Sequence, residues 1–246
     1  MFKVEYAALK YYNSIISEEC LYIGMLFHNL TTGDRDFRYI SNFKRFRAFD
    51  DEADVSFIKA YLLGIKTQVE NNILNYQDSF SIKEFTRVYV NEFKFTDITT
   101  IEIDEQEDYV DNLTRMYLKF DFTREKRLSN TEEKKYIKRI LSSKNVIFEN
   151  SKIPGVYNEN INFDYIVGGV AIKLFSFREK DATKLIPTAK QWSFSAEELS
   201  NRYKVFFLYD NDDHTPQMKI VLQILQKHAE VYQLQEGLSS VLKAIS

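Results

Sequence analysis

The apolar residues of this chain recur with two different periods, and this limits the folds that it can adopt. Apolar and polar residues alternate in Phe2–Leu9 and in Glu19–His28, which is typical of β-strands with one buried face. Turn-forming residues fill Asn29–Asp34, and Arg35–Ser41 follows as a third strand-like segment. The N-terminal segment therefore predicts an antiparallel meander.

A helical period follows. Apolar residues recur every three or four positions over Asp54–Tyr76, which predicts an amphipathic helix. Phe85–Val90 is strand-like, and Ser129 three residues before Glu132 is a capping box that predicts a helix start. The rest of the chain predicts three strands, with Gly168-Gly169 as a hairpin turn, and then alternating helices and strands.

These patterns predict an α+β, or mixed α/β, fold in two domains, residues 1–125 and 126–246. The first is an antiparallel meander with helices, and the second is a small mixed sheet flanked by helices. Charge supports this division: residues 1–125 hold 15 Lys and Arg against 22 Asp and Glu, whereas residues 126–246 hold 18 against 14. The opposed net charges of −7 and +4 suggest two different surfaces.

Composition excludes several classes of protein. A single cysteine, Cys20, excludes a disulfide scaffold and a cysteine-based zinc site. Seven Gly and three Pro among 246 residues exclude a low-complexity chain. A net charge of −3 argues against a general binder of phosphate backbones. We expect no membrane-spanning segment, and hence a cytosolic location.

Three polar clusters have ordinary structural interpretations. Cations alternate with aromatic residues in Phe43–Phe49, a mixture that can bind nucleic acid but is also typical of a helix with a buried aromatic side. The acidic run Glu102–Asp111 lacks a calcium-loop pattern, so we interpret it as a solvated helix start. The loop Asp210–Pro216 suits a metal site or, more simply, a turn and helix cap.

The N-terminal half resembles the domain-of-unknown-function 3037 family of bacterial proteins. Tyr6 and Ala7, followed by Lys10 and Tyr11, match the first strand of that family. Further matches are Glu18–Glu19, Ile23–Leu26, Phe43–Asp51 and Phe95–Phe120. The family has no established activity. Some of its members are encoded beside kinase-like proteins, and the resemblance therefore implies a partner protein rather than a reaction.

The C-terminal half has the order of elements found in the PD-(D/E)xK nuclease superfamily, and it resembles a degenerate member. The resemblance assigns Asp164 to the second strand and Lys173 to the third, with Ala171 at the position of the usual acid. Such enzymes hold Mg²⁺ or Mn²⁺ with carboxylates. A working site would therefore need Asp164 and a migrated acid as metal ligands, either Glu149 or, less easily, Glu179.

The missing acid, the aromatic content of 15% and the opposed domain charges favour a non-catalytic, cytosolic interaction protein of a bacterium or phage. A toxin–antitoxin, defence or counter-defence system is the setting that the family resemblance implies. One alternative is a metal-dependent nuclease with Asp164, Lys173 and Glu149 as catalytic residues. Another is a nucleic-acid-binding module that uses the more basic C-terminal half. Under the first hypothesis the partner is another protein and we expect no cofactor.

Overall fold

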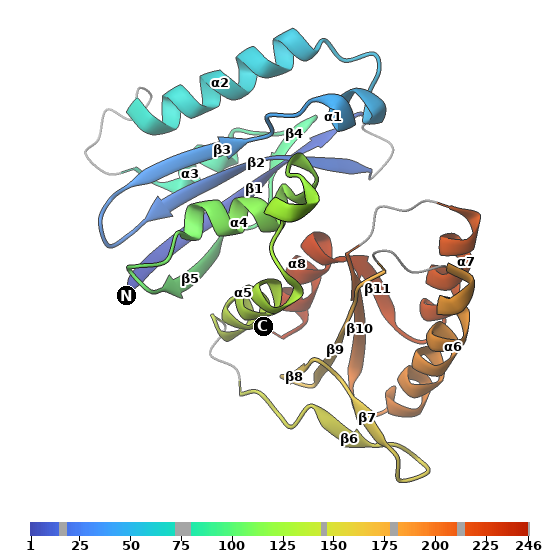
Figure 1. Cartoon of the computed structure of the whole chain (residues 1–246). Coiled ribbons are helices and arrows are strands. Elements are labelled where there is room, and N and C mark those ends of the chain that lie inside the picture. The colour runs from blue at the N-terminus through green and yellow to red at the C-terminus, as the bar shows by residue number, and fades with distance from the viewer. Residues whose placement is uncertain (15–18, 72–79, 144–146, 178–181, 211–214, 246) are drawn as a thin grey trace. The chain divides into compact units, whose positions relative to one another are not determined.

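The computed structural model describes residues 1–14, 19–71, 80–143, 147–177, 182–210 and 215–245 (Figure 1). The chain forms two compact units, Met1–Ser143 and Lys144–Ser246. Each unit combines helices with a β-sheet, so the fold class is α+β. Among the described residues, no helix has both the length and the apolar character needed to cross a membrane.

Unit 1 is built on a five-stranded antiparallel sheet. Its strands are β1 (Phe2–Tyr12), β2 (Cys20–Asn29), β3 (Arg35–Tyr39), β4 (Phe93–Phe95) and β5 (Thr99–Ile103). β1, β2 and β3 pair in sequence order, as the alternating pattern predicted. The other edge of β1 pairs first with β5 and then with β4. β1 is therefore the central strand of the sheet.

Helices cover both faces of this sheet. They are α1 (Lys44–Phe49), α2 (Val55–Asn71), α3 (Ile82–Arg87), α4 (Tyr109–Tyr117), α5 (Asn130–Ser142) and the 3-10 turns Lys119–Asp121 and Arg124–Lys126. Tyr6 of β1 contacts Tyr117 of α4, whereas Tyr11 contacts Phe46 of α1. Because both faces are covered, the consecutive β1 residues from Tyr6 to Leu9 are all buried, whichever face of the sheet they point to.

Unit 2 has a four-stranded mixed sheet in the order β11-β10-β9-β8 and a separate hairpin of β6 and β7. The strands are β6 (Lys152–Pro154), β7 (Asn160–Asn162), β8 (Tyr165–Val167), β9 (Val170–Phe175), β10 (Lys204–Tyr209) and β11 (Glu230–Gln233). The helices are α6 (Ala182–Leu199), α7 (Pro216–Leu225) and α8 (Leu234–Ala244). The predicted two-glycine turn joins β8 to β9, with φ angles of 55° and 75° at Gly168 and Gly169.

One local prediction differs from the structure. The segment Phe85–Val90 is not a strand, because Ser81 accepts a hydrogen bond from Glu84 N and starts α3 at Ile82. The helix predicted over Asp54–Tyr76 is α2, which the structure describes as far as Asn71, and residues 72–79 lie outside the described part.

The boundary between the compact units follows α5, whereas the sequence placed the domain boundary near residue 125. α5 belongs to unit 1 because its Arg139 and Tyr136 bind Glu107. When this basic helix is counted with unit 1, the two units no longer have opposed net charges. Residues 1–143 carry 21 Lys and Arg against 24 Asp and Glu, and residues 144–246 carry 12 of each.

Candidate functional site

The structure brings together the two residues of the suspected nuclease motif. Asp164 directly precedes β8, and its backbone N–H donates to Ile172 O of β9 at 2.9 Å. This register places Asp164 beside Lys173, the next residue of β9, and Lys173 Nζ lies 3.4 Å from Asp164 Oδ2. The juxtaposition follows from the hairpin, so these residues are neighbours whether or not they catalyse a reaction.

The surroundings of Lys173 are those of a structural ion pair. Its ammonium group donates to Asn162 O at 3.0 Å and lies 4.6 Å from the centre of the Trp192 ring. Asp164 Oδ2 also accepts from Leu174 N at 2.9 Å. The side chains of Lys173 and Asp164 are only 22% and 10% exposed. The ammonium group is thus held between a carboxylate, a carbonyl and an aromatic face at the margin of a buried core.

The other acids that a metal site would need are Glu149, which binds Tyr203, and Glu179. Glu149 N donates to Ile166 O, and the Glu149 carboxylate accepts from the Tyr203 hydroxyl at 3.2 Å. Ala171 is completely buried, so its position faces the core. Glu179 lies outside the described residues. Within the described ranges, no group of three or more His, Cys, Asp or Glu side chains is arranged to hold a metal ion.

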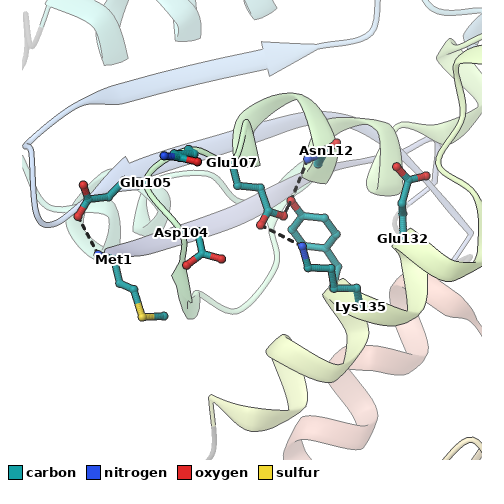
Figure 2. Close-up of a pocket in the computed structure, with 9 residues that line it drawn as sticks. Met1, Asp104, Glu105, Glu107, Asn112, Glu132 and Lys135 are labelled. Carbon is teal, nitrogen blue, oxygen red and sulfur yellow. Dashed lines mark hydrogen bonds and ion pairs between the residues drawn. The ribbon is translucent and has the colours of Figure 1, made fainter.

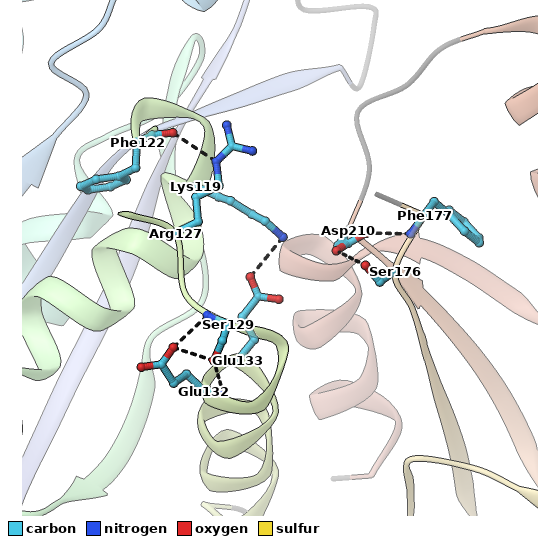
Figure 3. Close-up of polar contacts among 9 residues, drawn as sticks. All are labelled: Lys119, Phe122, Arg127, Ser129, Glu132, Glu133, Ser176, Phe177 and Asp210. Atoms are coloured by element: carbon cyan, nitrogen blue, oxygen red, sulfur yellow. Dashed lines mark hydrogen bonds and ion pairs between the residues drawn. The ribbon is translucent and has the colours of Figure 1, made fainter. Parts of the chain in front are cut away.

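The acidic loop after β10 begins with a residue that joins two strand ends. Asp210 accepts hydrogen bonds from Ser176 Oγ at 3.0 Å and from Phe177 N at 3.1 Å, so it ties the end of β10 to the segment after β9 (Figure 3). Thr215 caps α7 by accepting from Met218 N. Residues 211–214 lie outside the described part of the chain, so the structure does not bear on the metal interpretation of this loop.

A different site lies in unit 1, between the loop after β5 and the helices α4 and α5 (Figure 2). It is a cavity of about 610 Å³. Carboxylates predominate among the charged side chains of its lining, which consists of Met1, Asp104, Glu105, Gln106, Glu107, Asn112, Glu132, Lys135 and Tyr136. Two of these carboxylates are already in ion pairs, Glu105 with the Met1 ammonium at 2.8 Å and Asp104 with Arg139 at 3.5 Å. The four carboxylates of the lining still outnumber the cations Met1, Lys135 and Arg139, and this small excess of negative charge suits a group with positive charge and hydrogen-bond donors.

Glu107 is the most constrained of these carboxylates. It accepts hydrogen bonds from the Tyr136 hydroxyl, from Arg139 Nη1 at 2.7 Å and from Lys135 Nζ at 3.4 Å. Asn112 Nδ2 donates to the Tyr136 hydroxyl at 3.0 Å. The side chain of Glu107 is 14% exposed. Its orientation is therefore fixed before any ligand arrives, which lowers the entropic cost of binding.

These contacts also set the ionisation of the site. Burial by itself would raise the pKa of Glu107, but the hydrogen bonds from Tyr136 and Arg139 outweigh it and lower the pKa below its ordinary value. Burial and the hydrogen bond to Glu107 raise the pKa of Tyr136. Near neutral pH the cavity therefore contains an ionised carboxylate beside a neutral phenol.

The sequence held a partial signal for this cavity. The acidic run Glu102–Asp111 was interpreted as a solvated helix start, and Asp108 does cap α4 by accepting from Asp111 N. Three acids of the run before that cap, Asp104, Glu105 and Glu107, form one wall of the cavity instead. Their partners Tyr136 and Arg139 come from α5, which the predicted boundary placed in the other domain. Only the tertiary structure shows that the two segments meet.

No protein-family model, curated protein or solved structure matches this chain.

Proposed function

We propose that this chain is a non-catalytic interaction protein whose unit 1 cavity receives a cationic group of a partner protein. The observation that carries the proposal is the fixed, ionised carboxylate of Glu107 in a cavity that other carboxylates also line. A Lys or Arg side chain has the charge and the donors that such a site binds. The partner would then be recognised through an exposed basic residue.

The unit 2 motif supports the non-catalytic part of the proposal. A nuclease lysine acts on a water molecule or on the scissile phosphate. Lys173 instead donates to Asn162 O and lies against Asp164 and Trp192. These contacts explain the position of Lys173 by ion pairing and packing, without a catalytic role.

The cellular setting is proposed from the family resemblance. We infer a cytosolic protein of a bacterium or phage that acts in a defence, counter-defence or toxin–antitoxin system. The resemblance of the N-terminal half to a family without established activity is consistent with a binding role.

Affinity capture from the native host, with quantitative mass spectrometry, tests the proposal. Wild-type chain should recover a specific partner, and Glu107→Gln combined with Asp104→Asn should lose most of it. Glu102→Gln is the matched control, because Glu102 is exposed on β5 and does not line the cavity. Equal recovery by all three proteins, or no specific partner at all, would overturn the proposal.

The nuclease alternative would use the same two residues, Lys173 and Asp164, whose side chains lie 3.4 Å apart. It predicts Mn²⁺-dependent cleavage of DNA or RNA that disappears in Lys173→Ala, in Asp164→Ala and in Glu149→Ala.

Nucleic-acid binding without cleavage predicts an affinity that falls steeply with salt. The charge argument for that last alternative has weakened, because residues 144–246 have no net charge.

A further inference from the structure

Cations are concentrated in two segments of unit 1, which are α1 with the residues just before it and the 3-10 turns that follow α4. Residues 41–49 and 119–127 together contain seven Lys and Arg against two acids. The rest of unit 1 contains 14 Lys and Arg against 22 acids. The net charge of the chain therefore does not reveal this local excess of positive charge.

The two segments lie side by side, although they are far apart in sequence. Asn42 N donates to the Asp121 carboxylate at 2.7 Å. The guanidinium group of Arg45 lies 4.2 Å from the centre of the Phe120 ring, and that of Arg127 lies 5.1 Å from the centre of the same ring. One aromatic ring thus carries a cation from each segment, and the two segments form a single basic surface.

The exposed half of α1 contributes three cations and no acid to this basic surface. At 100° per residue, the residues that follow one another around this half are Arg47, Lys44, Ala48 and Arg45, and all four are exposed. Phe46 lies on the opposite side and is completely buried. The side chains of Lys44 and Arg47 make no hydrogen bond or ion pair with another described residue. They are therefore accessible to an anionic ligand.

The turns after α4 add three more cations. Arg127 Nε donates to Phe122 O at 3.1 Å (Figure 3), which restricts the guanidinium that lies against Phe120. Arg124 and Lys126 are exposed. A cation over an aromatic ring keeps its charge, and a restricted side chain loses less entropy when a ligand binds. This part of the basic surface is therefore partly ordered in advance.

Acids reduce the charge of the basic surface but do not cancel it. The cation Lys119 is buried in an ion pair with Glu133, so six accessible cations remain against the two acids Asp121 and Glu125. Asp50, at the end of α1, accepts from the Tyr11 hydroxyl of β1 at 2.7 Å and thus lies toward the sheet. Three further acids precede α2 in the sequence, namely Asp51, Glu52 and Asp54.

We propose that the basic surface binds the phosphate backbone of single-stranded nucleic acid. Four of its six accessible cations are arginines, and arginine binds phosphate through two parallel hydrogen bonds. Arginine planes also stack on unpaired bases, which favours a single strand. An anionic membrane fits less well, because the aromatic residues between these cations, Phe43 and Phe46, are buried and do not offer an apolar side for insertion.

The expected binding is weak and depends on salt. Binding through phosphate contacts without base recognition has a dissociation constant of roughly 1 to 100 µM near physiological salt. Each phosphate contact to a single strand adds about 0.7 to the slope of log affinity against log salt concentration. The basic surface does not include Glu107 or its partners, so this inference and the proposed function stand or fall separately.

Fluorescence anisotropy with labelled oligo(U) RNA and oligo(dT) of about 20 nucleotides tests the inference. Wild type should bind both, with an affinity that falls as KCl rises from about 50 to 300 mM. Lys44→Ala with Arg47→Ala should weaken binding at least about tenfold and lower the salt slope by about 1.4. Lys3→Ala with Lys83→Ala is the matched control, because both lysines are exposed in unit 1 but lie outside the two segments. Circular dichroism confirms that each variant is folded.

Three results would overturn the proposal. The first is that neither oligonucleotide binds at about 50 mM KCl. The second is binding that the Lys44 and Arg47 variant leaves unchanged, or that the control variant weakens equally, because the contact would then lie elsewhere. The third is adsorption to phosphatidylserine vesicles without binding to either oligonucleotide, which would assign the basic surface to a membrane.

Discussion

Lys173 provides the sharpest test of how unit 2 is built. If Lys173 and Asp164 form a structural ion pair, Lys173→Met should lower the free energy of unfolding of unit 2. A lysine retained only for catalysis would behave differently, because replacing it removes activity and leaves stability equal or higher. Methionine keeps most of the apolar stem on the Trp192 ring while removing the charge.

The size of the effect follows from the contacts. The ammonium group donates a hydrogen bond to Asn162 O at 3.0 Å, and such bonds from charged groups contribute about 1.5–3 kcal/mol. A cation over an aromatic ring, here at 4.6 Å, adds about 0.5–1 kcal/mol. Side chains that are 22% and 10% exposed retain part of their solvation. We therefore expect Lys173→Met to cost about 2–3 kcal/mol.

A double-mutant cycle isolates the pair. Asp164→Asn keeps an acceptor for Leu174 N and removes the negative charge. If the pair is coupled, the double variant should lose about 1 kcal/mol less than the sum of the single losses. Urea unfolding followed by tryptophan fluorescence measures this, because Trp192 is the only tryptophan and packs in unit 2 against Phe163. Additive losses, or an unchanged Lys173→Met, would refute the structural reading.

Three further predictions concern the core and the cavity. Gly237→Ala would place a Cβ in steric conflict with Leu208 Cδ2, so it should destabilise unit 2 by about 1–3 kcal/mol. An unchanged midpoint of urea unfolding would contradict this packing. Since the folded state lowers the pKa of Glu107 below 4.5, its ionised carboxylate stabilises the fold above that pH, and the contribution is lost as the pH falls through the folded pKa. Glu107→Gln should therefore be less stable near pH 7, and its urea midpoint should decline less than that of wild type between about pH 5 and 3; parallel declines would argue against the assignment. Tyr136→Phe removes a donor to Glu107, so carbon NMR of the carboxyl should show its pKa moving up, and an unmoved pKa would mean that the hydrogen bond is unimportant.

Local patterns predicted much of the fold because their causes are local. The alternation in Phe2–Leu9 and Glu19–His28 predicted strands that are present as β1 and β2. The capping box at Ser129 predicted the start of α5, where both reciprocal hydrogen bonds form. The same local reasoning failed at Phe85–Val90. There a serine cap selected a helix for a segment whose aromatic and β-branched residues suited either structure.

The sequence by itself therefore determined the α+β class, the N-terminal meander and the hairpin turn at Gly168-Gly169, because turns, strand alternation and helix caps depend on residues close in the chain. Only the tertiary structure decided that α5 belongs to unit 1, and hence that Tyr136 and Arg139 reach Glu107. That assignment depends on contacts between segments far apart in sequence. Neither periodicity nor spacing records such contacts.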